Sequence, residues 1–389
     1  MMAGRAVVLP RPWRAAALAL AGLGVATIAT GLAWSPARTW PNLLLADVYL
    51  LSMALSAALF MSIQYLSGAG WSVVLRRIAE AMMSGLPIAA ALMLSLFFGR
   101  QTLYPWAQPD GSTGTALSAS KTLYLSTPLV FVRMSAVLAL WMLLVHRLRK
   151  TSLRQDHDPA PAIHRRLIAY SAVFVVVFAV TFTIGSVDWL MSLDPHWSSA
   201  IFAIYVFAGL LVSGLAALTL IAIALRALGP LSGVIKPAHL HDLGKLLLAF
   251  STFWAYIWLS QYLLIWYGNL PEEVTYYVRR TGGQWTGLFL LNLSANWVVP
   301  FVVLLPRAAK RNARVLAAVC VVLLVGHWLD LYLLIMPEIW SRPMAGPLEA
   351  IIPLGYAGLF VYLLSRALAQ APLVPLHDPY LHESLNHET

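Results

Sequence analysis

A few ionisable side chains lie inside long apolar runs of this chain, where a charged group is costly and is therefore a candidate for function. His327 and Asp330 are three residues apart, so they share one face of a helix. Histidine changes its charge near neutral pH, and a nearby carboxylate can hydrogen-bond the imidazole and raise its basicity. Such a pair suits proton exchange beside an apolar ligand such as a quinol.

Three further charged residues fall in the same half of the membrane, counted at about 1.5 Å per residue from the centre of each run. They are Arg133, Asp188 and Asp47. Together with His327 and Asp330 they are predicted to line a quinol site or a proton pathway. The alternative is an ion-pair network that only holds helices together. That alternative is stronger for Asp47 and Asp188, which lie near run ends and could be interfacial.

A second group lies near the other side of the membrane. Glu80 begins one apolar run, and Asp242 and Lys245 begin another. These residues are predicted to form the inner entry of a proton route, although a carboxylate in a first helical turn is also favourable for the helix dipole alone. No metal site and no covalently bound cofactor are expected. The single cysteine, Cys320, excludes a cysteine-ligated iron–sulfur cluster and a haem attachment motif.

The elements that position these groups follow from the composition. Of the 389 residues, 60% are apolar and 11% are charged, whereas a soluble domain has about 25% charged residues. A membrane-spanning helix needs about 20 apolar residues. Ten such runs are present, at 15–34, 43–66, 78–98, 127–147, 165–191, 198–226, 242–268, 283–305, 312–336 and 346–369. The sequence therefore predicts an all-α polytopic membrane protein of about ten transmembrane helices, forming a single integral membrane domain over 1–389.

The formal charge of +10 is unevenly distributed between the two sides of the predicted membrane. Of 26 Lys and Arg, Arg133 lies inside a helix and 19 lie on the side of the N-terminus. The other side has only Arg38, Arg100, Lys121, Arg279, Arg280 and Arg342. This bias predicts cytoplasmic termini and removes the support for nucleic acid as a partner. The first run is longer than a usual signal-peptide core and is expected to be retained as a helix.

One spacing that occurs twice in the chain suggests an internal duplication. Asp188 precedes Pro195 by seven residues, and Asp330 precedes Pro337 by the same interval in a later part of the chain. This spacing fits a four-helix unit over 43–191 that is repeated over 198–336, and chance is the alternative. The polar tail over 372–389 is expected to be extended, and a partner subunit is one surface on which it could lie.

Several segments resemble a known family. They are Gly185–Trp197 (GSVDWLMSLDPHW), His241–Lys245 (HDLGK), Phe250–Pro271 (FSTFWAYIWLSQYLLIWYGNLP) and Pro375–Glu388 (PLHDPYLHESLNHE). Together they resemble the ActF subunits of bacterial alternative complex III, a quinol:cytochrome c oxidoreductase of the respiratory chain. The wider group is the NrfD/PsrC-like membrane proteins.

The resemblance implies two four-helix bundles plus a flanking helix pair in the bacterial inner membrane. It implies a paralogous NrfD-like membrane subunit and iron–sulfur and c-type cytochrome subunits as partners, besides membrane lipid. The family label is quinone-binding subunit, with menaquinone or ubiquinone as the ligand, but the better-supported quinol pocket belongs to the paralogue. A proton pathway is therefore the expected role of an ActF-like chain. Asp188 carries over as a pathway residue, with Asp242 and Lys245 at the inner end.

Two other functions stay open at this point. The chain could be a structural anchor for redox subunits, with no quinol or proton role. It could also be an independent secondary transporter, which would need broken helices at matching points of two inverted halves. The sequence shows no evident broken pair, so the transporter is disfavoured.

Overall fold

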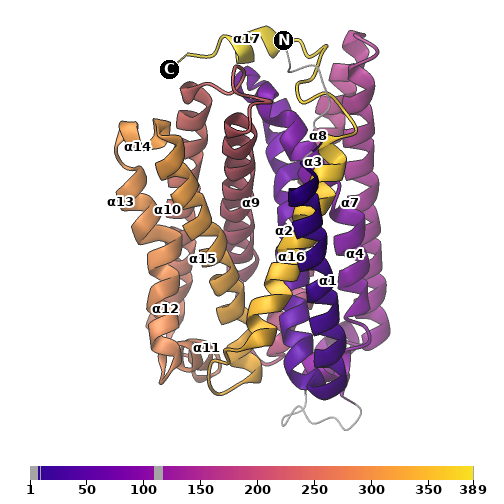
Figure 1. The fold of residues 1–389 in the computed structure, drawn as a ribbon. Coiled ribbons are helices and arrows are strands. Elements are labelled where there is room, and N and C mark those ends of the chain that lie inside the picture. Colours follow the sequence, from indigo (N-terminus) through magenta and orange to yellow (C-terminus); the bar gives the residue numbers. More distant parts are fainter. Residues whose placement is uncertain (1–7, 9, 109–116, 389) are drawn as a thin grey trace.

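The computed structural model describes residue 8 and residues 10–108 and 117–388. In these residues all regular secondary structure is helical, and ten segments are long and apolar enough to cross a membrane, which confirms the predicted class. The ten run side by side (Figure 1). They are α1 (Arg11–Trp34), α2 (Pro36–Ser67), η1–α3–α4 (Gly70–Ser95), α7 (Thr127–Gln155), α8 (Pro161–Trp189), α9 (Phe202–Ala227), α10 (Pro237–Gly268), α12–η4–α13 (Trp285–Leu304), α15 (Ala313–Ile339) and α16 (Pro347–Leu368).

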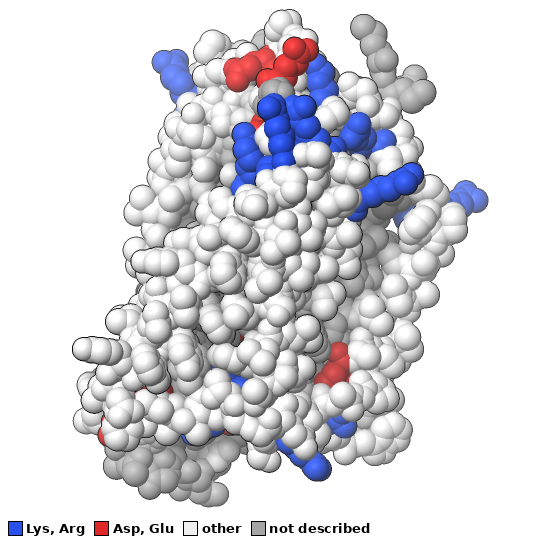
Figure 2. Space-filling view, turned by 90° about the vertical axis from the view of Figure 1, so that its left-hand side faces the viewer, with Lys and Arg blue, Asp and Glu red and all other residues white. Residues whose placement is uncertain are grey.

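The two described ends of the chain lie at one end of the bundle, which we call the terminal face; the other end is the opposite face (Figure 1). The terminal face carries two short helices, α14 (Arg307–Arg311) and α17 (Leu381–Leu385). The opposite face carries α5 (Arg100–Leu103), η2 (Pro105–Ala107), α6 (Ala119–Tyr124), η3 (Met191–Leu193) and α11 (Pro271–Thr281). Figure 2 shows basic side chains gathered at the terminal end, above a broad and largely uncharged belt.

The spanning helices form two bundles and a flanking pair. The spans α2, α3–α4, α7 and α8 pack together, and α9, α10, α12–α13 and α15 form the second group. The bundles meet where α2 packs against α9, and these two helices are the most buried of the ten. The contact is close: a Cβ atom on Gly214 would lie 1.7 Å from the Ser56 hydroxyl. The junction therefore requires a residue without a side chain.

Small residues also hold the flanking pair, α1 and α16. A Cβ atom on Gly24 would lie 2.7 Å from the Cα atom of Gly355, and one on Gly358 would lie 2.6 Å from the Ala17 carbonyl oxygen. In a bilayer the hydrophobic effect does not drive helices together, so close backbone packing through small residues supplies the attraction. The first apolar run is thus an integral part of the fold.

Two of the spans are interrupted, although no broken pair at matching points is evident from the sequence. The third span changes from α3 (Arg76–Met83) to α4 (Leu86–Ser95) at Ser84 and Gly85, just before Pro87. The eighth contains the π-helical turn η4 (Ser294–Val298) between α12 (Trp285–Leu293) and α13 (Val299–Leu304), which includes Pro300. Each break lies beside a proline, which cannot donate the backbone hydrogen bond of a regular helix. The breaks fall in the second span of the first bundle and in the third span of the second bundle, so they are not at matching points as a transporter of this kind would need.

The tail does not remain extended. Its described residues lie over the terminal face of this same chain and include α17. The Ser384 hydroxyl donates to the Trp71 carbonyl at 2.7 Å, and His239 of α10 contacts the Ser384 carbonyl at 3.0 Å. The tail therefore connects the first bundle to the second.

Candidate functional site

A single carboxylate lies at the centre of the second bundle. Asp330 of α15 is 1% exposed. Its Oδ1 accepts hydrogen bonds from the Tyr205 hydroxyl and, at 2.8 Å, from Nδ2 of Asn292. Its Oδ2 accepts one from Nε1 of Trp254 at 3.1 Å. The donors come from α9, α12 and α10, so four helices meet at this group. Asn296 extends the chain of amides by donating to Asn292 at 2.7 Å.

His327 lies beside this cluster, as its spacing from Asp330 predicts. A Cβ atom on Gly209 would lie 2.9 Å from the His327 ring and 3.3 Å from Oδ2 of Asp330, so the two side chains share one helix face across from a glycine. The expected imidazole–carboxylate hydrogen bond is absent: neither ring nitrogen of His327 has a partner among the described residues. Asp330 accepts from its three other donors. The ring of His327 packs instead on Tyr49 of α2, with 5.4 Å between centroids.

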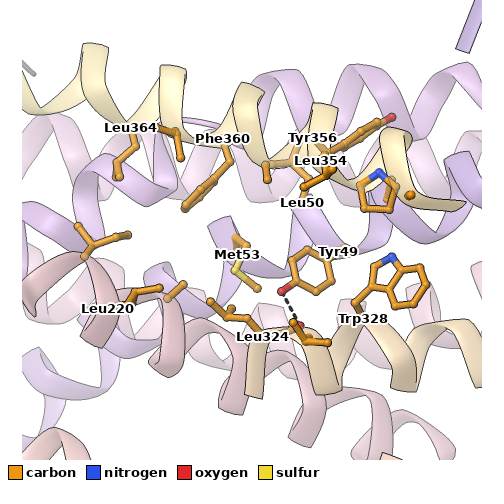
Figure 3. A pocket seen from close by; sticks show the side chains of 18 of the residues that line it. Tyr49, Leu50, Met53, Leu220, Leu324, Trp328, Leu354, Tyr356, Phe360 and Leu364 are labelled. Atoms are coloured by element: carbon orange, nitrogen blue, oxygen red, sulfur yellow. Dashed lines mark hydrogen bonds between the residues drawn. The ribbon is translucent and has the colours of Figure 1, made fainter. Parts of the chain in front are cut away.

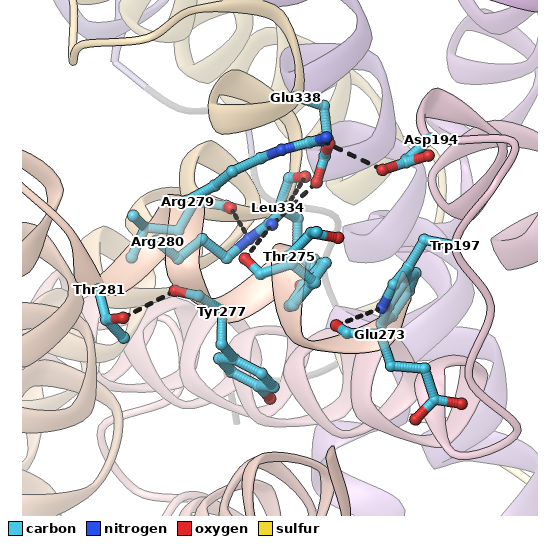
Figure 4. A network of polar contacts seen from close by, with 12 residues as sticks. Asp194, Trp197, Glu273, Thr275, Tyr277, Arg279, Arg280, Thr281, Leu334 and Glu338 are labelled. Carbon is cyan, nitrogen blue, oxygen red and sulfur yellow. Dashed lines mark hydrogen bonds and ion pairs between the residues drawn. The ribbon is translucent and has the colours of Figure 1, made fainter. Parts of the chain in front are cut away.

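Polar groups continue from Asp330 toward the opposite face. A cavity of about 10 Å³, roughly the space of one water molecule, is lined by Tyr205, Asn292 and Arg280, among others. Arg280 donates from Nε to the Leu333 carbonyl at 2.8 Å and forms a 2.8 Å ion pair with Glu338 (Figure 4).

Arg280 lies on α11, outside the spans, and is 2% exposed. Burial acts to lower its pKa, but the hydroxyl of Tyr276 and the carboxylate of Glu338 outweigh burial and raise it. Glu338 also pairs with Arg279, which reaches Asp194 at 3.1 Å (Figure 4). These ion pairs therefore hold α11 against the end of α15 at the opposite face.

Arg133 and Asp188 form a site of their own in the first bundle. Nε and Nη2 of Arg133 donate to the two carboxylate oxygens of Asp188 at 2.9 and 3.0 Å. The guanidinium also lies 3.9 Å from the centre of the Tyr124 ring. Both charges are thus satisfied by each other, and the sequence expectation that they gather with His327 and Asp330 is not met.

An apolar pocket lies between α2, α9, α15 and α16 (Figure 3), and Asp47 of α2 is linked to it through the lining residue Tyr356. The pocket has a volume of about 560 Å³. Its wall hydroxyls are engaged: Tyr356 donates to Oδ1 of Asp47 at 2.5 Å, and Tyr49 donates to the Leu324 carbonyl at 3.0 Å. Glu349 at one end binds Arg38 at 2.6 Å. Tyr49 lines the pocket and also packs against the ring of His327.

The predicted entry residues lie at the terminal face, in two separate places. Glu80 is buried in the first bundle, where it accepts from the Ser152 hydroxyl and pairs with Arg77. Arg77 also pairs with Asp156 at 2.5 Å. Asp156 in turn accepts the Leu376 amide of the tail at 3.1 Å.

Asp242 lies on the second bundle. It pairs with Lys245, three residues farther along α10, at 2.5 Å. Its second carboxylate oxygen contacts Nε2 of His387 in the tail, also at 2.5 Å. The sequence could not indicate the His387 contact, because 145 residues separate the two side chains. The tail thus covers this candidate entry.

The sequence did not identify Tyr205 and Trp254 as hydrogen-bond donors to Asp330. The chain has 15 Tyr and 15 Trp, so neither residue stands out by its type, and only Trp254 lies in a segment that carries the family resemblance. Arg280 lies on α11 and Glu338 lies in the last turn of α15, both outside the predicted apolar runs, where a charge gives no signal. Asn292 was visible as an amide within an apolar run, which is the signal that could have located the cluster.

The fold and these buried groups define a multi-span membrane protein with polar sites inside its helix bundles. No family model matches the chain. No curated protein matches it either.

Proposed function

We propose that this chain is a membrane subunit of a quinol:cytochrome c oxidoreductase complex and contributes a proton pathway in the half nearer the opposite face. The observation that carries the proposal is Asp330, buried at the meeting point of four helices and held by hydroxyl, indole and amide donors. Membrane interiors retain such groups chiefly where ions or protons move. The assignment to this class of complex rests on the resemblance of the segments around Asp188, Asp242, Trp254 and His387.

The proposed route uses groups that can exchange protons. Asp330 and Tyr205 share a hydrogen bond, and the one-water cavity beside Tyr205 is also lined by Arg280, on the side of the opposite face. His327 offers an unpartnered nitrogen next to the carboxylate. On the terminal side, Asp242 and Trp254 both lie on α10. They are separated by about three helical turns, and water molecules along α10 must bridge that interval.

The basic residues set the direction. Their concentration at the terminal face supports a cytoplasmic placement of that face by the positive-inside rule, and the family resemblance supports the bacterial inner membrane. Asp330 then exchanges protons with the outer side, where a quinol-oxidising complex releases them. Iron–sulfur and c-type cytochrome subunits would supply the redox centres, and a paralogous membrane subunit would lie beside this chain.

A quinol site within this chain is the second candidate. The observation in its favour is the 560 Å³ pocket, whose wall residue Tyr49 contacts His327. Against it, the hydroxyls of Tyr49 and Tyr356 are already bonded to protein acceptors, and Glu349 is paired with Arg38. Among the described side-chain donors of the lining, only the indole N–H of Trp328 has no partner. A quinol head would therefore find one free donor there and no group suited to take up its protons, so the proton pathway is the better-supported role.

The test replaces Asp330 with Asn in the assembled complex. Quinol:cytochrome c activity and proton release should both fall by roughly 10²-fold or more, as expected when a proton-transfer group is lost. The Arg133→Lys variant, altered in the first bundle, serves as the control and should retain both. If the complex with Asp330→Asn assembles and keeps full activity and proton release, the chain is a structural anchor.

A further inference from the structure

The pocket between the bundles and the flanking pair has the shape of a groove. Its lining on α16 runs from Glu349 to Leu364. That interval is about four helical turns, or roughly 22 Å along the helix axis. The hydrocarbon core of a bilayer is about 30 Å thick. The groove therefore runs along α16 over a length comparable to most of the core, and Figure 3 shows the row of lining side chains from Tyr356 to Leu364.

The groove opens toward the lipid and is apolar along its length. On its rim Val325, Leu354 and Val361 are 60%, 52% and 38% exposed, and in a membrane these side chains face hydrocarbon. The interior carries Leu50, Met53 and other aliphatic or aromatic side chains (Figure 3). A space left empty here would forfeit dispersion contacts on all its walls, so the bilayer fills it.

One end of the groove is ionic. Glu349 lies in the first turn of α16, toward the opposite face, and accepts from Nε and Nη2 of Arg38. The Arg38 side chain remains 28% exposed, and its Nη1 takes no part in the pair. Among the described lining residues, the other end of the groove, at Leu364, has no comparable charge.

We propose that the groove binds one hydrocarbon chain of a membrane phospholipid, with the phosphate of its headgroup beside Arg38. The length of the groove suits one extended acyl chain. Between Glu349 and Leu364 the described lining is mostly aliphatic or aromatic: Tyr49 and Tyr356 already donate within the protein, and only the indole N–H of Trp328 is a side-chain donor without a described partner. The lipid then fills the seam between α16 and the two bundles and holds the flanking pair in place.

The first experiment labels the unaltered protein. The full chain, in its native complex, is placed in vesicles of phosphatidylethanolamine that carries a photoreactive group at mid-chain. Mass spectrometry should find crosslinks concentrated on α16 and α15, near Phe360 and Val325. Labelling spread evenly over these helices and the exposed face of α7 would overturn the proposal. So would an isoprenoid quinone that co-purifies in equimolar amount and blocks the labelling.

The second experiment fills the groove. Ala357 is an exposed residue of α16 that lines it, and Ala139 is an exposed residue near the middle of α7, outside it. Ala357→Trp should sharply weaken labelling in the groove, because the indole occupies space that the acyl chain would fill and removes its dispersion contacts there. Ala139→Trp should leave it unchanged. Equal labelling in both variants would refute the site, and if Ala357→Trp does not fold, the labelling pattern of the unaltered protein decides.

Discussion

The hydrogen bond between Trp254 and Asp330 provides a quantitative test of the buried cluster. In Asp330→Asn the amide oxygen can replace Oδ1, which accepts from Tyr205 and Asn292. The amide nitrogen then replaces Oδ2, where it faces the indole N–H of Trp254, and two donors cannot bond each other. We expect Asp330→Asn to lower the free energy of unfolding by about 1–3 kcal/mol, the usual cost of an unsatisfied buried donor.

A double-mutant cycle isolates the free energy of the hydrogen bond between Trp254 and Asp330. Trp254→Phe in the unaltered chain removes the hydrogen bond and leaves a cavity, whereas in Asp330→Asn it leaves only the cavity. The coupling energy should lie between about 0.6 and 1.7 kcal/mol, the average and upper values for hydrogen bonds inside membrane proteins. Denaturation of the purified protein in detergent, at fixed pH, gives all four values.

Trp258 offers a matched control within the same helix. It stacks on Trp254 with 6.1 Å between centroids, but Asp330 accepts its indole hydrogen bond from Trp254 and not from Trp258. Trp258→Phe should therefore create a similar cavity and show coupling near zero with Asp330→Asn. Equal coupling for the two tryptophans would refute the assigned hydrogen bond and the placement of Asp330 that depends on it.

Three further predictions concern contacts outside that cluster. Gly24→Ala should cost about 1–3 kcal/mol by overpacking the α1–α16 contact, whereas Gly22→Ala, which meets no described atom within 4 Å, should be neutral or stabilising in thermal denaturation. Asp378→Asn should leave the buried Arg76 guanidinium without its carboxylate and should increase hydrogen exchange in the tail and η1. Arg133→Gln should destabilise by about 2–4 kcal/mol, because it leaves a buried carboxylate unpaired.

Each of these has a result that would contradict it. Equal stability of the two glycine variants would show that α1 does not pack on α16 as described. Unchanged exchange after Asp378→Asn would mean that the tail is held by other contacts. For Arg133→Gln, removal of Asp188 in the same chain should restore part of the lost stability; a double variant as unstable as the sum of the singles would exclude the pair.

The ten spans were predictable because hydropathy is a property of each segment alone. Length and composition determine whether a run crosses the membrane, and no partner has to be known. The interruptions in the third and eighth spans were not, because Pro87 and Pro300 lie in runs that remain apolar throughout. A break changes the backbone without changing the hydropathy.

The site was predictable in depth but not in the plane of the membrane. Counting residues places Arg133, Asp188 and Asp330 in one half, but it gives no direction around the helix axis. The structure puts the first two in one bundle and Asp330 in the other. Arg133 also reaches Asp188, which lies farther from the membrane centre, because a long arginine side chain can extend toward the surface. Similar depth is therefore a necessary condition for a shared site, and partner choice is settled by packing.

The separation of these sites sharpens the functional argument. Arg133 and Asp188 neutralise each other, and so do Glu80 and its arginine, so in each pair the structure alone accounts for the charge. Within the described chain, the groups bonded to Asp330 are all neutral: a hydroxyl, an indole and an amide. A buried carboxylate held only by neutral donors can gain or lose a proton without breaking an ion pair. By that criterion Asp330, rather than Asp188, is the residue at which proton transfer through this chain should be tested first.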